Sequence, residues 1–383
     1  MSEPGEPRSP VDPSGPIEPI EPIEPSSAAP ADVSDTVPME GPSDDPAGNP
    51  PVPESVDRPI GPGHGSVPRP GGRIFNLDER AAPGLYLLGW LSTLLGAGIL
   101  IVAFMSGGGT AAVALAGVAL GALSIGLISA AGAQAIQRRV DGRTGYDGPS
   151  PILVFAAAVA SSNFLVLLVA VGGSAFGLHG DTPMGVLIGL LVSAVVNVGL
   201  VRLLVVGTRS LSWADMGIHR PTRATPSDLA VGALGGVAVV YVTAGFALLL
   251  SLFLAQPPPQ LPQPTDLGGQ LITLIAAALV APVSEEIFFR GFTTSAWART
   301  STAMRAIVQG AIFFAFTHVL TLDGSTFSQG AQWAIFAFAV RLPVSLALGW
   351  IFLRRRSIYA SLAMHVAFNG VPLLLVMTLG ASR

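Results

Sequence analysis

The chain contains neither cysteine nor lysine. Among its 383 residues there is no Cys, and all 20 basic residues are arginine. Without cysteine the protein forms no disulfide, no thiolate metal site and no cysteine nucleophile, and without lysine it has no catalytic side-chain amine. Charged residues are also scarce, at 11% of the chain, whereas 50% of the residues are hydrophobic. This balance predicts a polytopic membrane protein.

The few charges are unevenly distributed. Residues 1–80 hold 15 of the 24 acidic residues but only 5 of the 20 basic ones, and they contain no long apolar run. Prolines recur every third residue from Pro4 to Pro25, which is the period of the polyproline II helix. Low hydrophobicity and high charge favour disorder. We therefore predict a disordered, acidic, Pro-rich cytoplasmic tail over residues 1–80, with a docking arm for a proline-binding or basic partner as the alternative.

Nine apolar segments follow the tail, and each is long enough to cross a membrane as a helix of about 20 residues. They lie at 85–105, 110–133, 151–172, 184–206, 228–254, 269–290, 304–320, 331–353 and 358–380. The sequence thus predicts an all-α fold, a polytopic transmembrane helical bundle of about nine spans. We divide the bundle into N-terminal transmembrane helices over residues 84–206 and a C-terminal core over residues 207–383.

Arginines mark alternate connections between these segments. The connections without arginine are 106–109, 173–183, 255–268 and 321–330. Because arginine concentrates on the cytoplasmic side, the pattern places the N-terminus in the cytoplasm and the C-terminus outside. Arginine in place of lysine, the lack of cysteine and the richness in Gly, Ala and Val indicate a bacterial source with a GC-rich genome. The predicted location is therefore the bacterial cytoplasmic membrane.

Charged residues interrupt the sixth apolar segment. Glu285, Glu286 and Arg290 lie near its end, and an ionisable group in a membrane helix costs about 2.5–3.5 kcal/mol on insertion scales, so it marks a candidate functional site. Glu286 and Arg290 are four residues apart and can pair on one helical face, whereas Glu285 points about 100° away. We predict that the pair is a structural lock and that Glu285 is free for chemistry. Pro282 is expected to free a backbone carbonyl just before them.

Polar residues in two later segments complete the candidate site. His318 lies in the seventh segment, and His365 lies in the ninth, with Asn369 one turn later on the same helical face. Amide hydrolysis needs a base for water, donors for the oxyanion and a proton for the leaving amine. Glu285 can act as the base and His318 can share its proton. His365 and Asn369 can face the oxyanion, although these residue types also permit a proton relay in a transporter.

Three motifs in this order resemble those of the CPBP family. They are Glu-Glu-x-x-x-Arg at 285–290, Phe-x-x-x-His at 314–318 and His-x-x-x-Asn at 365–369. The family comprises the type II CAAX prenyl proteases and the bacteriocin-processing (Abi) intramembrane proteases. The resemblance covers roughly residues 210–380, including the Trp213–Ile218 stretch that is similar to the family's usual lead-in. It implies that residues 207–383 form a CPBP-like intramembrane protease core.

The resemblance also implies roles for individual residues. The implied catalytic residues are Glu285, His318, His365 and Asn369, with Glu286 and Arg290 as supporting residues. Glu285 and His318 would activate water, and His365 and Asn369 would form the oxyanion site. The family is described both as metalloproteases and as glutamate proteases without a catalytic metal. If zinc is present, its ligands would be Glu285, His318 and His365. We favour no obligatory metal, because His365 with Asn369 is better suited to an oxyanion site.

The implied function is an intramembrane endopeptidase that hydrolyses a peptide bond in a membrane-associated peptide or protein. A bacterial source favours a bacteriocin-like or other membrane-associated peptide over a prenylated CAAX protein. The expected partners are the lipid bilayer, such a substrate and a partner of the Pro-rich tail, with no nucleic acid. Two other classes stay open: a proton-coupled membrane transporter, whose mark is an inverted repeat with paired broken helices, and a non-enzymatic immunity or scaffold protein.

Two further placements follow from the topology. Glu285 should lie near the cytoplasmic end of the sixth segment, whereas His318, counted from residue 304, would lie about 21 Å up at 1.5 Å per residue. We therefore expect the sixth helix to continue past Arg290 and the seventh to begin below the membrane surface. Arg341, in the eighth segment, is expected to pair with a helical carbonyl or an acid rather than with a substrate.

Overall fold

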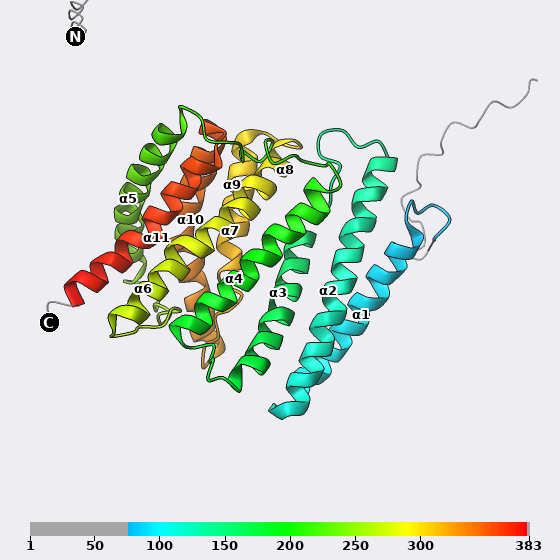
Figure 1. The fold of residues 1–383 in the computed structure, drawn as a ribbon, viewed down its shortest axis with the longest axis horizontal. Helices are drawn as coiled ribbons and strands as arrows, with labels where there is room; N and C mark the ends of the chain where they lie inside the picture. Colours follow the sequence, from blue (N-terminus) through cyan, green and yellow to red (C-terminus); the bar gives the residue numbers. More distant parts are fainter. Residues whose placement is uncertain (1–75, 381–383) are drawn as a thin grey trace, which may run out of the picture. The chain divides into compact units, whose positions relative to one another are not determined.

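The computed structural model of the chain describes residues 76–380, which Figure 1 draws in colour. Over these residues the structure consists of helices and their connections, with no β-strand. The predicted all-α class is therefore confirmed. The tail predicted over residues 1–80 lies outside the described residues except for its last five.

Eight helices are long and apolar enough to cross a membrane within the described range. They are α1 (Pro83–Met105), α2 (Gly109–Val140), α3 (Pro151–Ser174), α4 (Pro183–Val201) with its continuation η1 (Arg202–Val206), α5 (Thr225–Leu250), the composite helix Leu267–Ala298, α10 (Phe327–Arg355) and α11 (Ile358–Gly380). The predicted transmembrane bundle is thus confirmed. The predicted seventh span is a shorter apolar helix, α9 (Ala303–Thr317).

Side chains explain why α9 ends before the apolar run does. The sequence stays apolar as far as Leu320, which is why the prediction extends that far. In the structure, the Thr317 hydroxyl donates to the Phe314 carbonyl at 2.8 Å, and the His318 ring nitrogen Nδ1 lies at the same distance from it. Such local side-chain bonds compete with the helical hydrogen bonds and favour termination.

The composite helix is one continuous rod of five pieces. These are α6 (Leu267–Ile275), η2 (Ala276–Val280), α7 (Ala281–Glu285), η3 (Glu286–Thr294) and α8 (Ser295–Ala298). The two η pieces are π-helical, a form that bonds each N–H to the carbonyl five residues back and recurs at functional sites. The rod passes Arg290 and ends at Ala298, so the expected continuation of the sixth helix is confirmed. It contacts α4 on one side and α11 on the other (Figure 1).

An aromatic cluster fixes the rotation of the composite helix about its axis. Phe288, Phe289 and Phe292 are all buried, and the ring of Phe288 lies 5.2 and 5.5 Å from the other two. Phe155 of α3 and Phe314 of α9 pack on the same cluster, with centroid distances of 6.0 Å to Phe288 and 5.1 Å to Phe289. Edge-to-face rings at these separations stabilise the packing beyond simple area burial.

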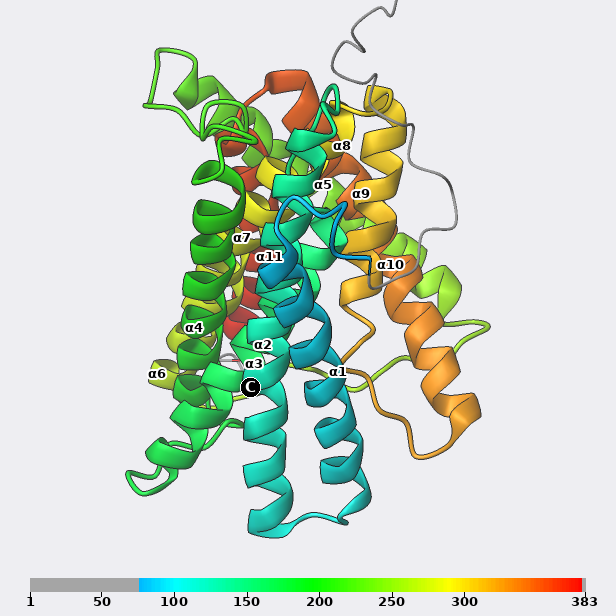
Figure 2. The same cartoon turned by 90° about the vertical axis from the view of Figure 1, so that its right-hand side faces the viewer.

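Glycines bring α1 and α2 into close contact. A Cβ added at Gly96 would lie 2.8 Å from the Ala119 carbonyl and from Leu123, and one added at Gly89 would lie 3.0 Å from the Ala130 nitrogen. Small residues at such crossings let two backbones approach in a membrane. The resulting hairpin lies at one edge of the bundle in Figure 1 and faces the viewer in Figure 2. Gly98, by contrast, faces open space.

The Trp213–Ile218 stretch anchors two elements of the C-terminal core. Gly217 has a φ of 69°, a left-handed conformation that glycine adopts without strain. Its carbonyl accepts the Ile358 N–H at 3.1 Å, at the start of α11. Asp215 pairs with Arg299, just past the end of α8, at 2.8 Å. Hydrogen bonds from the Ser212 backbone and hydroxyl, with the Arg299 charge in support, hold the pKa of Asp215 below its usual range.

Candidate active site

A buried ion pair lies at the centre of the C-terminal core. Glu286 is fully buried and Arg290 is 2% exposed, and Arg290 Nη1 lies 3.0 Å from Glu286 Oε1. Arg290 Nη2 donates to the Ser345 hydroxyl of α10 at 3.1 Å, and the guanidinium lies 4.3 Å from the centre of the Phe314 ring. The predicted pairing is confirmed. Because both charges are buried, removing one partner is expected to cost about 3–5 kcal/mol.

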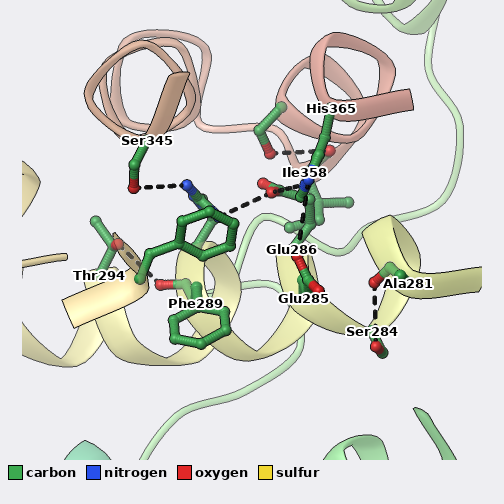
Figure 3. A network of polar contacts seen from close by, with 12 residues as sticks. Ala281, Ser284, Glu285, Glu286, Phe289, Thr294, Ser345, Ile358 and His365 are labelled. Atoms are coloured by element: carbon green, nitrogen blue, oxygen red, sulfur yellow. Dashed lines mark hydrogen bonds and ion pairs between the residues drawn. The ribbon is translucent and has the colours of Figure 1, made fainter. Parts of the chain in front are cut away.

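His365 of α11 lies between the two carboxylates. Its Nδ1 is 2.8 Å from Glu286 Oε1, and its Nε2 is 3.7 Å from Glu285 Oε2. Figure 3 shows His365 directed at both glutamates. Since an ionised carboxylate only accepts hydrogen bonds, Nδ1 carries a proton and donates it. The other nitrogen, Nε2, therefore faces Glu285.

The two neighbouring glutamates differ in access. The Glu285 side chain is 24% exposed, whereas that of Glu286 is 0% exposed. Glu286 uses Oε1 for both Arg290 and His365. Its Oε2 makes no hydrogen bond of good geometry among residues 76–380, and the nearby Ser361 hydroxyl lies 3.2 Å from the Ile358 carbonyl. Glu286 is thus committed to the fold, and Glu285 is the carboxylate that a substrate or water can reach.

His318 stands at the end of α9, next to the same group. Its Nδ1 lies 2.8 Å from the Phe314 carbonyl, and a carbonyl can only accept, so Nδ1 carries the proton and Nε2 is left to accept one. The Phe314 ring packs against both imidazoles, at 4.5 Å from that of His318 and 5.8 Å from that of His365. Because Phe314 contacts both rings and His365 lies 3.7 Å from Glu285, these three predicted site residues lie in one neighbourhood.

Asn369 completes a helical hydrogen bond that Pro282 cannot make. In η2 the Ala281 N–H donates to the Ala276 carbonyl, five residues back. The next donor in that series would be residue 282, which is proline and has no N–H. The Ala277 carbonyl is the acceptor that this missing N–H leaves without a donor. Asn369 Nδ2 donates to that carbonyl at 2.9 Å. The freed carbonyl expected from Pro282 is therefore satisfied from α11, which uses one of the two amide N–H bonds of Asn369.

Arg341 of α10 borders this group as a second cation. Its Nη1 donates to the Ala337 carbonyl at 3.1 Å, so the expected pairing with a helical carbonyl is confirmed. The charge of Glu285 also acts on it. One arginine is thus locked to Glu286, and another stands near the accessible Glu285.

The donor set does not fit a metal ion. Over residues 76–380, no three side chains of His, Cys, Asp or Glu are grouped so that they could hold one. This includes Glu285, His318 and His365, the ligands expected if zinc is present.

Two features of the site have only weak signals in the sequence. Ser345, which holds Arg290, is one polar residue in an apolar segment and is indistinguishable from the other small residues there. The contact of His365 with Glu286 joins residues 79 positions apart, so no local pattern reports it. Phe314 is visible as the first residue of Phe-x-x-x-His, but its contact with Arg290 is not.

Comparison with protein families gives one match. Residues 267–371 match the family model described as type II CAAX prenyl endopeptidase, Rce1-like. The matched range runs from the first residue of α6 into α11 and includes all three motifs. Neither the curated proteins nor the solved structures contain a match to the chain. Residues 267–371 are therefore similar to an Rce1-like domain, which is consistent with a CPBP family protease.

Proposed function

Given this Rce1-like domain, we propose that the protein is an intramembrane endopeptidase that hydrolyses a peptide bond in a membrane-associated peptide or protein. The match supports a CAAX-type intramembrane endopeptidase in general. The observation that carries the assignment of residues is the position of His365, with one ring nitrogen on buried Glu286 and the other facing accessible Glu285. A substrate carbonyl near Nε2 would lie beside Glu285 as the base, and Nε2 would donate a hydrogen bond to it when the ring carries a second proton.

Glu285 and His318 activate water in this proposal. Glu285 is the accessible carboxylate, and His318 presents an unprotonated Nε2 because its Nδ1 proton lies on a carbonyl. Glu285 takes a proton from water, and the hydroxide oxygen bonds to the scissile carbonyl carbon. Positioned general bases of this kind accelerate such steps by about 10²–10⁴-fold.

His365 and Asn369 receive the oxyanion. As the carbonyl π bond breaks, its electron pair moves to oxygen. Prearranged hydrogen-bond donors stabilise this negative charge more strongly than water does. His365 is held by Glu286 so that Nε2 faces that oxygen. In this proposal the ring has taken a second proton from solvent before the step, and Nε2–H donates to the oxyanion and keeps its proton. Asn369 keeps one amide N–H beyond the one it gives to Ala277. The C–N bond then breaks, and the proton held by Glu285 passes to the leaving amine.

Glu286 and Arg290 support the site without touching the substrate. Their pair is buried, and it fixes both the helix rotation and the ring of His365. By the positive-inside assignment, the site lies toward the cytoplasmic end of the composite helix, with the N-terminus of the chain in the cytoplasm and its C-terminus outside. We assign the protein to the bacterial cytoplasmic membrane and its substrate to bacteriocin-like or other membrane-associated peptides.

Replacement of Glu285 tests this function. Peptide termini are compared by proteomics between cells that carry the wild-type chain, Glu285→Gln and Asp323→Asn. Asp323 is an exposed acid of the α9–α10 connection and serves as the control for charge removal. We expect a set of termini that depends on Glu285 and persists in Asp323→Asn. Identical termini in all three strains, with equal amounts of folded protein, would exclude the protease and leave a transporter or a scaffold.

A further inference from the structure

A second candidate site lies in the N-terminal half of the bundle. A cavity of about 570 Å³ opens between α1, α2 and the first turn of α3. Small-molecule sites span about 300–1,000 Å³, so this cavity is of suitable size. None of its lining residues belongs to the candidate active site.

The lining changes from cationic to apolar along the helix axes. Arg80, Arg138 and Arg143 stand at the end of the cavity where α1 begins and α2 ends. Leu127 and Ala130 lie two to four turns deeper on α2 at 3.6 residues per turn. A ligand that fills the whole cavity must therefore have one anionic end and one hydrocarbon end.

Aromatic side chains stand at the transition between the two parts. Tyr86 and Trp90 of α1 line the cavity one to two turns from its cationic end. These residue types concentrate where a membrane helix passes from hydrocarbon to headgroups. Arg80 lies 4.2 Å over the centre of the Tyr86 ring, a cation–π contact that holds its guanidinium at the same level.

The cationic end lacks matching anions. Arg143 makes no side-chain hydrogen bond or ion pair within the described part of the chain, and its charge acts unfavourably on that of Arg138. Arg138 donates one N–H to the Gly148 carbonyl at 2.6 Å. Asp141 is the one acid among the lining residues, and its carboxylate accepts from Gln137 at 2.9 Å. Three arginines against one aspartate leave the cavity with an excess of positive charge.

We propose that this cavity binds a phospholipid with an anionic headgroup, with the phosphate among the three arginines and an acyl chain along the apolar part between α1 and α2. Basic pockets between helices on the cytoplasmic side of a membrane have the chemistry that anionic headgroups need. Guanidinium groups bind phosphate oxygens in pairs and so favour phosphate over other anions. The site does not depend on the proposed protease function.

The test measures the thermal unfolding midpoint of the detergent-solubilised full-length chain while phosphatidylglycerol, phosphatidylcholine or inorganic phosphate is added. We expect phosphatidylglycerol to raise the midpoint at lower concentration than phosphatidylcholine, and inorganic phosphate to leave it unchanged. Arg143→Gln is the first variant, because Arg143 is exposed and supports no contact in the fold. Its loss should raise the half-saturating phosphatidylglycerol concentration about fivefold, and Arg80→Gln/Arg143→Gln about 25-fold.

Arg223→Gln is the matched control, since Arg223 is an exposed arginine on the same side of the bundle and outside the cavity. It should leave the phosphatidylglycerol response unchanged. Equal responses to the two lipids, or an Arg143→Gln response equal to that of Arg223→Gln, would overturn the proposal. A midpoint raised equally by inorganic phosphate would identify a free-phosphate site and refute the lipid.

Discussion

The N-terminal and C-terminal halves of the bundle bury different kinds of residue. In the four N-terminal spans, 17–28% of the most apolar window is buried inside the protein. In the C-terminal core the share reaches 44% in the composite helix and in α10, while the flanking α5 and α11 have 11% and 17%. The first half is held by close backbone contacts such as Gly96 on Ala119, and many of its large apolar side chains are exposed on the outside of the bundle. The second half encloses Glu286 and Arg290. Close packing therefore holds the N-terminal helices together, whereas the C-terminal core also contains a buried ion pair.

The largest expected effect on stability comes from replacing Arg290 of the C-terminal half, and Arg202 of the N-terminal half serves as its comparison. Arg290→Met leaves the Glu286 charge buried without its partner, and we expect a loss of about 3–5 kcal/mol in the free energy of unfolding. Arg202→Met, at an exposed position of η1, should change stability by less than about 0.5 kcal/mol. Denaturant unfolding in detergent measures both. Equal losses would mean that the Glu286–Arg290 pair is not what holds the core.

A second comparison uses two glycines of the same helix. Gly96→Ala places a Cβ 2.8 Å from the α2 backbone, and such overpacking costs about 1–3 kcal/mol. Gly98→Ala enters open space and gains helix propensity instead. We expect the first variant to unfold at a lower temperature and the second to match or exceed the wild type. Similar midpoints would show that α1 does not need its close contact with α2.

Asn369 has a structural contact and a proposed catalytic role, which a double-mutant cycle separates. Asn369→Ala should cost about 1–2 kcal/mol, because it leaves the Ala277 carbonyl without a donor. Pro282→Ala restores a backbone N–H for that carbonyl, so Asn369→Ala should cost less in this background. If Asn369 also faces the oxyanion, cleavage stays low in the double variant even though stability recovers. Recovery of both would reduce Asn369 to a structural residue.

The smallest expected effect concerns Asp215 and pH. Its pKa is held below the usual range by the Ser212 and Arg299 contacts, so its stabilising contribution is present above the unfolded pKa and is lost as pH falls through the folded pKa. Asp215→Asn should therefore lower the unfolding midpoint slightly at pH 7, and the difference from the wild type should disappear once the pH falls below the lowered pKa of Asp215. A constant difference at every pH would point to packing rather than charge.

Patterns among neighbouring residues predict much of this fold. They do not predict contacts between residues that are far apart in the sequence. Hydropathy and arginine placement predict the spans, and the four-residue spacing predicts the Glu286–Arg290 pair, because both depend on neighbours along one helix. The contact between His365 and Glu286 depends on how α11 packs on the composite helix, and α9 ends early because of side-chain bonds at Phe314. The cavity between α1 and α2 is similarly invisible, since Arg80 and Arg138 line one cavity only after the two helices pack together.

The shortness of α9 has a consequence for the surrounding bilayer. Its 15 residues rise about 22 Å at 1.5 Å per residue, against a hydrocarbon thickness of about 30 Å, and a bilayer adapts to such hydrophobic mismatch by thinning locally. A dimple in the leaflet beside α9 would shorten the path from bulk water to His318, which caps that helix. Local thinning of the membrane would then give water access to the site where hydrolysis needs it.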